Sequence, residues 1–465
     1  MTIYSAVILV YLLVLVFISF KWGRSVKTQE DFSVAGRSLP TMVVFLTMLA
    51  TWTGTGSLFG NAEKTYRAGI AALILPLGEL IGIGLLIFLA ERARRMEQIT
   101  TQDILEKKYG VEARILGTIA LVIAAVTIVS YQYRAAGAVL HLAVPEISPG
   151  LAMGICVIFS ILYTAVAGMY SVAYTDVVMG ITMLVGMMAA LAVFWYKAGG
   201  VQGALQVLPP GHADFFGPIG WKEAWGLLLP PMLLALGDAN MYQRFFSAKS
   251  AGVAKRATVL TLLGVAWIDG VIILTAWFCS ALEWRGGHLE IPGRVIAYAA
   301  RDFLPPWLGA VVLTTLFAII LDTAIGYLLV PATALIRDVY QRFISPDAPP
   351  QKIVLWSRIL VVLLGIAAYY ISTLSKEFLS VALYAYTIYG AAVTPALVAA
   401  LVWPRATKQG AVASMLGGIL VTFYWEMSGR AASTGIDTVI PAGAVSILLL
   451  IGISLAAQKL RQAHA

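Results

Sequence analysis

The sequence predicts an all-α, polytopic membrane protein, and its composition and apolar patterning both lead to this fold class. Of the 465 residues, 60% are hydrophobic and only 12% are charged, with a mean hydropathy of +0.85. Soluble domains carry about 25% charged residues. The apolar residues lie in runs suited to membrane-crossing helices, without the period-2 alternation of barrel strands. A soluble enzyme and a disordered chain are therefore disfavoured.

Thirteen candidate spans follow from the rule that a helix needs roughly 20 apolar residues to cross a membrane. They run near 3–20, 41–62, 70–90, 115–140, 150–167, 173–196, 225–247, 257–282, 306–336, 353–374, 379–402, 410–427 and 438–458. The first run has no basic segment before it and no small-residue cleavage site after it, which indicates a retained helix. We expect one transmembrane domain, with an extra N-terminal helix (1–30), ten core helices (31–402) and two C-terminal helices (403–465).

The distribution of Lys and Arg over the loops on the two sides of the membrane predicts the orientation of the chain. With the N-terminus outside, most of the 32 Lys and Arg residues fall in loops on the cytoplasmic side, as the positive-inside rule requires. Thirteen spans then place the C-terminus in the cytoplasm. We expect a multi-pass protein of the cell (inner) membrane that is surrounded by lipid and has no nucleic-acid partner.

Two of the spans are predicted to be interrupted. The second contains the polar, Gly-rich stretch 50–57, and the seventh contains two prolines and a Gly-Asp-Ala-Asn sequence within 230–240. Backbone groups freed at membrane depth are tolerated only where they line a cavity or meet protein. With the first span counted as an extra, the two breaks lie at matching positions of two five-helix halves. This pattern is typical of an inverted-repeat transporter with its site near the midplane.

Four motifs, in order, resemble those of the sodium/solute symporter family. They are FSVAGRSLP at 32–40, GMYSVAYTD at 168–176, YQRFFSAK at 242–249 and LLVPATALIRDVY at 328–340. Choline-transporter-like members look closest, through ATW at 50–52, AE at 62–63 and SVAYTDVV at 171–178. The resemblance implies the leucine-transporter fold and alternating access driven by an ion gradient.

The resemblance also implies a sodium site between broken core helix 1 and core helix 8. Its ligands, carried over by motif, are the carbonyl oxygens of Ala50, Thr53 and Ile319 and the side chains of Asp322 and Thr323. Oxygen ligands suit a hard cation. The family usually has Ser where this chain has Asp322. The added charge would either tighten sodium binding or let the carboxyl group carry a proton.

Some family members hold a second sodium ion with the Asp of core helix 5 and hydroxyls one turn further along core helix 8. Asp176 is present here as a possible ion-coupling residue, but the hydroxyl positions read Ile325 and Gly326. A lone carboxylate does not replace the hydration shell of a cation at low dielectric. We therefore predict one sodium ion per transport cycle.

Core helices 1, 2, 3, 6 and 10 are expected to line the solute cavity. Trp52 falls where choline transporters place a cage aromatic, and a Trp face stacks well on a quaternary ammonium. Asp238 replaces another cage Trp, and Glu79 falls about where a cage Tyr would be, so the cage is incomplete. The residues predicted to bind the solute are Trp52, Glu79, Gln132, Arg134, Asp238 and Tyr386, and Tyr384, Tyr386 and Tyr389 are candidates for closing the cavity.

Arg134 is a basic residue in the middle of the fourth span, where charge is expensive. It either pairs with Glu79 in a structural role or binds a carboxylate of the solute, for which Arg is well suited. The sequence leaves both interpretations open.

We expect a secondary active transporter that couples sodium to a small polar organic solute, zwitterionic or cationic (amino-acid- or choline-like), and works as a monomer. Two alternatives share its fold: a proton-coupled transporter using Asp322, and a symporter of an anionic carboxylate bound by Arg134. A membrane-embedded enzyme is disfavoured because H-E-x-x-H, G-x-S-x-G and paired His/Cys motifs are absent from the sequence. A sensor would be expected to carry a cytosolic signalling domain.

Overall fold

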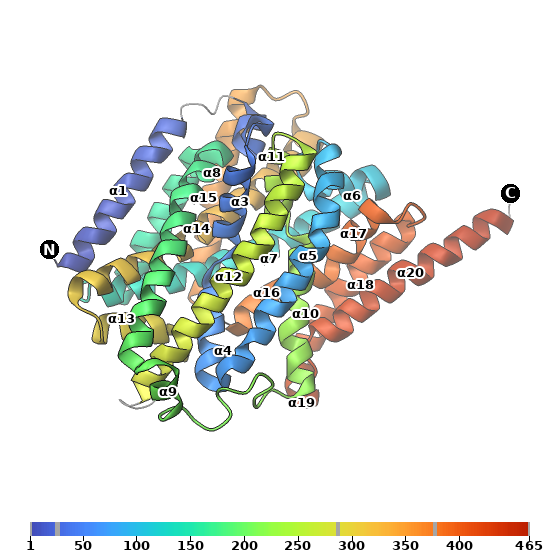
Figure 1. Ribbon diagram of the computed structural model, residues 1–465. Helices are drawn as coiled ribbons and strands as arrows, with labels where there is room; N and C mark the ends of the chain where they lie inside the picture. Colours follow the sequence, from blue (N-terminus) through green and yellow to red (C-terminus); the bar gives the residue numbers. More distant parts are fainter. Residues whose placement is uncertain (1, 24–27, 285–288, 375–378, 464–465) are drawn as a thin grey trace.

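The structure is a computed structural model that describes residues 2–23, 28–284, 289–374 and 379–463 (Figure 1). These described residues form helices and no strand, which confirms the all-α fold class. Of the loop residues counted for the predicted orientation, Arg24 and Lys27 (predicted inside) and Arg285 and Lys376 (predicted outside) lie outside the described ranges. The elements, with η marking 3-10 or π-helical turns, are α1 Ile3–Gly23, α2 Gln29–Val34, η1 Ala35–Arg37, α3 Thr41–Trp52, η2 Gly56–Gly60, α4 Asn61–Ala68, η3 Gly69–Leu73, α5 Ile74–Arg95, α6 Thr101–Tyr109, α7 Val111–Ala143, α8 Pro149–Ala198, α9 Gly200–Leu205, α10 Trp221–Gly237, α11 Ala239–Ser247, α12 Ala251–Trp284, η4 Pro292–Arg294, α13 Val295–Asp302, α14 Pro306–Ala334, η5 Leu335–Ile344, α15 Pro350–Ser372, α16 Leu379–Ala392, α17 Thr394–Val402, α18 Lys408–Met427, α19 Arg430–Thr434 and α20 Val439–Ala463.

The count of thirteen spans is not confirmed. Within the described residues, ten helices are long and apolar enough to cross a membrane, or eleven if the bent pair α16–α17 is one span. The two predicted spans that are not counted are the two that are broken. Of their main helices, α3 has only 12 residues and α10 only 17. A full apolar crossing needs about 20 residues in one helix, so each of these spans crosses only as two pieces.

The first break separates α3 from η2 and α4. Helix α3 ends at Trp52, the backbone of Thr53 is extended, and a π-helical turn, η2, leads into α4. The break lies within the predicted stretch 50–57. Its cause is the run of Thr and Gly residues, which favour non-helical backbone.

The second break separates α10 from α11 at Asp238. Pro230 and Pro231 do not make it, because both lie inside α10. The side chain of Asp238 accepts a hydrogen bond from the backbone N–H of Asn240 at 2.5 Å and so caps the start of α11. Both predicted broken helices are therefore present.

The site lies where α14 runs through the centre of the bundle. In its most apolar window, 89% of the residues are buried, against 22% for α1. Helix α14 packs against α7, α8, α3 and α1. Figure 1 places α1 on one flank and the pair α18–α20 on the other, so both broken helices lie between these flanks.

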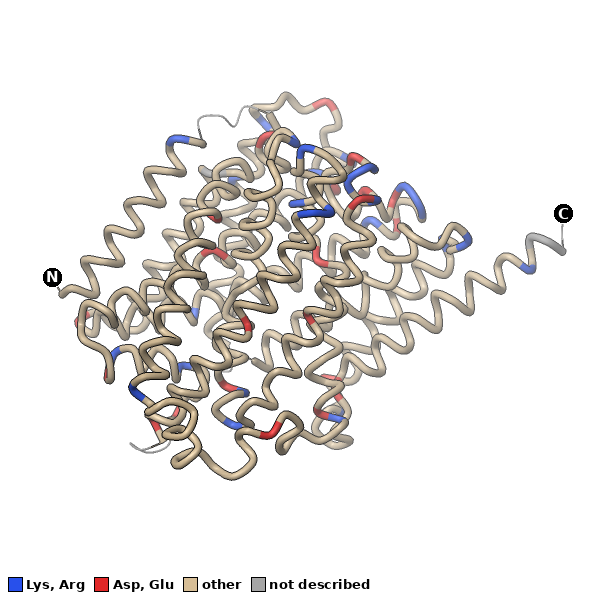
Figure 2. The backbone as a smooth tube through the Cα atoms, viewed as in Figure 1, with Lys and Arg blue, Asp and Glu red and all other residues tan. Residues whose placement is uncertain are grey.

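Lys and Arg gather at the end of the bundle that carries α6 (Figure 2). Arg92, Arg94 and Arg95 end α5 there, and Lys107 and Lys108 end α6. The middle of the bundle holds fewer charges. Burying a charge is costly. The acidic residues and arginines in the middle of the bundle must therefore be stabilised by partners, which the next subsection describes.

Candidate functional site

The first break frees backbone carbonyl groups at the end of α3. The N–H of Thr53 bonds the carbonyl of Leu49 at 3.0 Å, as in a regular helix. The N–H of Thr55 instead bonds the side-chain oxygen Oε1 of Gln132 on α7, at 3.1 Å. A helix leaves its last four carbonyl groups without intrahelical partners. At the end of α3 these carbonyls lie in the centre of the protein.

A group of oxygen atoms forms where α3 meets α14. The hydroxyl of Thr323 lies 3.3 Å from the carbonyl oxygens of Thr51 and Thr53 and 3.2 Å from that of Ile319. The structure thus brings together three of the predicted sodium ligands. It adds Thr51, which follows the predicted Ala50. Carbonyl and hydroxyl oxygens are the ligands that a hard cation takes.

This approach depends on glycine at position 54. A Cβ atom there would lie 2.7 Å from the side chain of Thr323 and 2.8 Å from Nε2 of Gln132. Any side chain would push α3 away from α14. Because Gly54 has no side chain, the end of α3 can approach Thr323 on α14 closely enough to form the oxygen group.

Asp322, the next residue of α14, is 1% exposed, and neither of its carboxylate oxygens has a hydrogen-bond partner among the described residues. It lies against the carboxyl group of Asp176 on α8, closely enough for direct interaction. Arg244 of α11 approaches Asp176, with Nη2 3.6 Å from Oδ2. Two buried carboxyl groups thus lie close to one guanidinium, and either a proton shared between the two acids or a monovalent cation would balance the remaining negative charge.

Hydroxyl groups link this acid pair to the oxygen group. Thr47 donates to Oδ2 of Asp176, and Arg244 Nη2 donates to the hydroxyl of Thr51 at 2.7 Å. Thr51 therefore contributes its side chain to the acid pair and its carbonyl to the group around Thr323. The two sets of oxygen atoms form one continuous polar region.

A small central cavity lies beside the oxygen group. Its volume is about 10 Å³, room for about one water molecule, so the solute path is closed at this level. Four predicted solute-binding residues, Trp52, Glu79, Gln132 and Tyr386, line it together with Gly54, Ser57, Ile128, Tyr131, Leu234, Thr323 and Tyr327.

Trp52 and Glu79 meet directly in this cavity. The indole Nε1–H of Trp52 donates to Oε2 of the buried Glu79 carboxylate at 2.6 Å. This contact orients the indole ring and places a carboxyl group in the cavity wall. A buried carboxylate suits a positively charged nitrogen on a ligand.

Tyr386 lines the central cavity. Its hydroxyl accepts a hydrogen bond from Tyr131 at 3.4 Å, and it lies so close to Gly56 that a Cβ there would be 2.3 Å away. Of the other candidates for closure, Tyr389 contacts Thr101 of α6 at 3.3 Å, towards the basic end. Tyr384 is half-buried and does not line the cavity. Of the three tyrosines, Tyr386 is the one that lines the central cavity, and its part in closing the cavity stays a prediction.

Two predicted solute contacts lie elsewhere. Both carboxylate oxygens of Asp238 are engaged within the protein, one by Asn240 and the other by the hydroxyl of Tyr327. Asp238 lines a separate small hollow with Trp52. Arg134 lies outside the central cavity and near Arg294 of η4.

Sequence reasoning missed the residues that complete the site. Thr47, Thr51 and Arg244 tie Asp176 into place, and Tyr131 and Tyr327 line the cavity. One signal was available for Arg244, which lies within the motif YQRFFSAK. The threonines repeat at i, i+4 on one face of α3, which is the spacing of side chains that share partners.

The sequence is similar over most of its length to known transporters. The model of the "Sodium:solute symporter family" matches residues 32–418. The osmoregulated proline transporter OpuE of Bacillus subtilis is 25% identical, over 94% of this chain and 92% of its own length. The sodium/proline symporter of Escherichia coli is 24% identical, over 90% and 87%. The human high affinity choline transporter 1 is 25% identical, over 90% and 75%.

Solved structures establish the fold. A substrate-bound, outward-open Na⁺-coupled sialic acid symporter superposes with a TM-score of 0.83 at 16% identity, covering 98% of both chains. The nucleobase-cation-symport-1 transporter Mhp1 superposes with a TM-score of 0.64 at 12% identity, covering 92% of this chain and 95% of its own. The predicted leucine-transporter fold is confirmed.

Proposed function

Because the chain belongs to the sodium:solute symporter family and is a sodium-coupled symporter of small solutes, we propose that its solute carries a positively charged nitrogen. The observation that supports this is the Glu79 carboxylate in the wall of the central cavity, held by Trp52 at 2.6 Å. Two of the relatives are named for proline and choline, which both bear such a nitrogen. A zwitterionic or cationic solute would place it against Glu79.

In this proposal Trp52, Gln132 and Tyr386 share the cavity with Glu79 and contact the solute. Asp238 acts indirectly, because it holds the start of α11 and the hydroxyl of Tyr327. Binding of an anionic solute by Arg134 in this cavity has less support, since Arg134 does not line it.

Sodium is proposed to bind between Thr323 and Asp322 with the carbonyl groups of the α3 end. Thr53 and Ile319 supply two of these carbonyls, and Thr51 or the neighbouring Ala50 supplies the third. The carboxylate oxygens of Asp322 have no donor among the described residues, which supports a cation at this place. The same site would bias the bundle between its inward- and outward-open forms, because its ligands come from both α3 and α14.

The basic end of the bundle is proposed to face the cytoplasm, with the N-terminus outside and the C-terminus inside. The residues that end α5 and α6 support this orientation. The extra helix α1 packs on α8 and α14, and α18 and α20 pack on each other and on α16. This arrangement supports a division into 1–30, 31–402 and 403–465, and a monomer is proposed to suffice for transport.

The test is uptake by the purified protein in proteoliposomes, driven by a sodium gradient. Amino acids, quaternary amines, carboxylates and sugars would be compared, first for wild type and then for Glu79→Gln. We expect uptake of amine-bearing solutes, and a rise of about tenfold in their KM for the variant, from one lost charged contact. Glu112→Gln, which alters an exposed pair with Lys408, is the matched control. Uptake of carboxylates that lack an amine, with no uptake of amines, would contradict the proposal.

A further inference from the structure

The helices around the site are held together in two units by separate contacts. A parallel β-bridge between Leu39 and Ala248 joins the start of α3 to the end of α11, and the N–H of Leu39 bonds the carbonyl of Ser247 at 3.1 Å. On α7, the hydroxyl of Thr118 donates to Asp338 of η5, the continuation of α14, at 3.1 Å. Helices α3 and α11 therefore form one unit, and helices α7 and α14 form another.

The two units meet at the sodium residues and again at Tyr327. The hydroxyl of Thr323 on α14 meets the carbonyls at the end of α3. One turn further along α14, the hydroxyl of Tyr327 donates to Oδ2 of Asp238, at the break between α10 and α11. Across the described ranges, the other side-chain hydrogen bond between this broken pair and α14 joins Gln243 to Thr333 at 3.5 Å. A hydrogen bond to a carboxylate is roughly twice as strong as a neutral one, so Tyr327–Asp238 is the stronger link. We call it the coupling bond.

Asp238 also connects Tyr327 to the acid pair. Its Oδ1 accepts a hydrogen bond from the backbone N–H of Asn240 at 2.5 Å, which fixes the first turn of α11. The side-chain oxygen of Asn240 accepts a hydrogen bond from Arg244, and Nη2 of Arg244 lies 3.6 Å from Oδ2 of Asp176. A continuous series of polar contacts therefore runs from the coupling bond, through the start of α11, to the acid pair beside the sodium residues.

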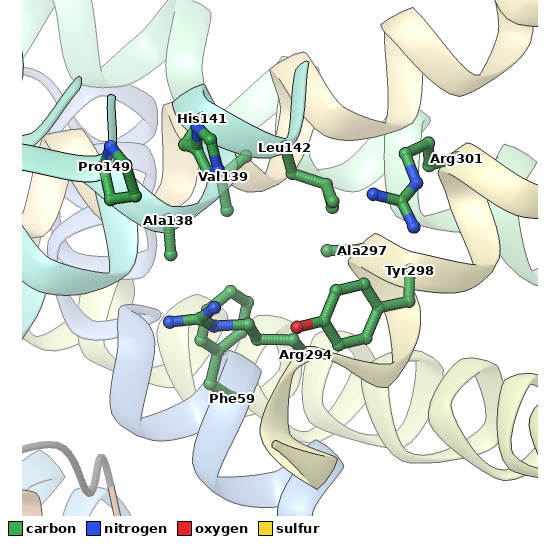
Figure 3. A pocket seen from close by; sticks show the side chains of 10 residues that line it. All are labelled: Phe59, Ala138, Val139, His141, Leu142, Pro149, Arg294, Ala297, Tyr298 and Arg301. Carbon is green, nitrogen blue, oxygen red and sulfur yellow. The ribbon is translucent and has the colours of Figure 1, made fainter. Parts of the chain in front are cut away.

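Tyr327 is at the same time part of the wall of the central cavity. That cavity has room for about one water molecule, so a solute enters it only if wall residues move. A larger cavity of about 350 Å³, shown in Figure 3, shares η2 and α7 with the central cavity: Phe59 lines the larger one and Ser57 the central one. A solute that moves from the larger cavity into the central one displaces the wall, and Tyr327 is the wall residue that is bonded to Asp238.

From these contacts we infer that Tyr327 and Asp238 are positioning residues that couple sodium movement to the solute. While the coupling bond is formed, α11 is held on α14, and the unit of α3 and α11 does not move past the unit of α7 and α14. A solute in the central cavity displaces the Tyr327 hydroxyl from Asp238 and so frees the two units. Sodium alone, bound at Asp322 and Thr323, does not cross the membrane. The inference rests on the proposed sodium site and adds the residues that prevent sodium flow without solute.

The test is uptake of radioactive sodium by the full-length protein in proteoliposomes, with no organic solute present. Tyr327→Phe removes the hydroxyl, and Asp238→Asn removes the charge but keeps a side chain that caps a helix well. We expect both variants to take up sodium about fivefold faster than wild type, the lower end of typical coupling effects. Tyr109→Phe is the matched control, because its buried hydroxyl bonds the carbonyl of Ala396 at 3.1 Å, and it should behave like wild type. Wild-type rates in both Tyr327→Phe and Asp238→Asn would overturn the inference.

Rubidium and a double variant distinguish lost coupling from a damaged bundle. If Tyr327→Phe takes up rubidium as fast as sodium, the bundle is leaky and the inference is overturned. Because both changes break one bond, the double variant should take up sodium no faster than the faster single variant; a rate equal to the product of the two effects would contradict a shared bond.

A third substitution separates the coupling bond from the sodium site on which it rests. Adding Asp322→Ala to Tyr327→Phe should abolish the sodium uptake that Tyr327→Phe allows. Persistent uptake would mean that sodium binds away from Asp322, whereas the difference between Tyr327→Phe and wild type would still support the coupling bond. Melting curves check that each variant is folded.

Discussion

At the end of the bundle that carries α6, Arg114 is surrounded by the carboxylates of Asp103, Glu106 and Asp338, whereas in the middle of the bundle Arg244 faces Asp176 and Asp322. Both clusters combine buried arginine and aspartate, and threonine hydroxyls take part in both. They differ in how the carboxylate oxygens are satisfied.

In the first, the Arg114 cluster, each carboxylate oxygen has a donor. Asp338 accepts from the hydroxyls of Thr100 and Thr118 at 3.0 and 3.1 Å. Both oxygens of Glu106 face arginines, at 2.6 and 2.8 Å. Asp103 bonds Arg114 and backbone N–H groups. The cluster ties α6, α7 and η5 together, and it needs no further ion.

In the second, the Asp322 cluster, three carboxylate oxygens have no hydrogen-bond partner among the residues that the structure describes: Oδ1 of Asp176 and both oxygens of Asp322. A buried carboxylate without a donor is strongly disfavoured. Such an arrangement persists where a bound cation or a shared proton completes it. The two clusters thus differ in the share of carboxylate oxygens that protein donors satisfy, and this difference is the reason that sodium is proposed to bind at Asp322 and not at the Arg114 cluster.

The largest expected effect follows removal of the unsatisfied acid. Asp322→Ala should abolish uptake driven by a sodium gradient while the protein stays folded, because the change removes charge that no protein donor satisfies. Proteoliposome uptake and a melting curve measure the two properties. If wild-type uptake with a proton gradient and no sodium equals that with sodium, the comparison fails and Asp322 carries a proton.

Replacing an aspartate of the Arg114 cluster should have the opposite effect: stability should fall, and the sodium dependence of uptake should stay unchanged. Asp338→Ala leaves Arg114 and two hydroxyls with one acceptor fewer. Two buried hydroxyls lose their acceptor, while Arg114 keeps the carboxylates of Asp103 and Glu106. We therefore expect a loss of stability of about 1–3 kcal/mol in thermal or denaturant unfolding. The sodium concentration for half-maximal uptake should stay at its wild-type value. A tenfold rise in that sodium concentration for Asp338→Ala would contradict the assignment of the Arg114 cluster to a structural role.

A smaller effect is expected from the hydroxyl at the edge of the Asp322 cluster. Thr323→Val keeps the side-chain shape and removes the oxygen that meets three carbonyls. One lost ligand contact of about 1.4 kcal/mol corresponds to a tenfold rise in the sodium concentration for half-maximal uptake. Thr314→Val, on the same helix and without a hydrogen-bond partner among the described residues, is the control. Equal sodium curves for both variants would place sodium elsewhere.

The finest distinction concerns the number of ions. Asp176 keeps one unsatisfied oxygen, but Ile325 and Gly326 add no side-chain oxygen beside it. We therefore expect one sodium ion per solute. The reversal potential of transport in proteoliposomes, measured against the sodium gradient, tests this value. A potential that fits two ions would mean that Asp176 and its threonines bind a second one.

The fold could be predicted largely from the sequence because membrane helices are fixed by local composition. Both breaks follow from residues within a few positions of Gly54 and Asp238, and both are present. The span count of thirteen is not confirmed, because it includes the two broken helices, whose pieces are too short to pass a length rule for continuous spans.

The site was less predictable because its contacts join distant residues. Thr47 and Asp176 are 129 residues apart in the chain, and Thr51 and Arg244 are 193 apart. Only tertiary packing sets such pairs. Placing Gln132 and Arg134 in one cavity neglected helical geometry, since residues two apart on a helix point in different directions. That rule would have separated them without a structure.

The two carboxylates and single guanidinium of the Asp322 cluster also have a consequence for membrane voltage. When ionised and without sodium, Asp176, Asp322 and Arg244 sum to one negative charge, and sodium brings the sum to zero. Each elementary charge moved across a potential of 100 mV changes the free energy by about 2.3 kcal/mol. An inside-negative potential should therefore speed the return of the empty carrier to its outward-open form, and leave the sodium-loaded step with a neutral solute comparatively insensitive to voltage.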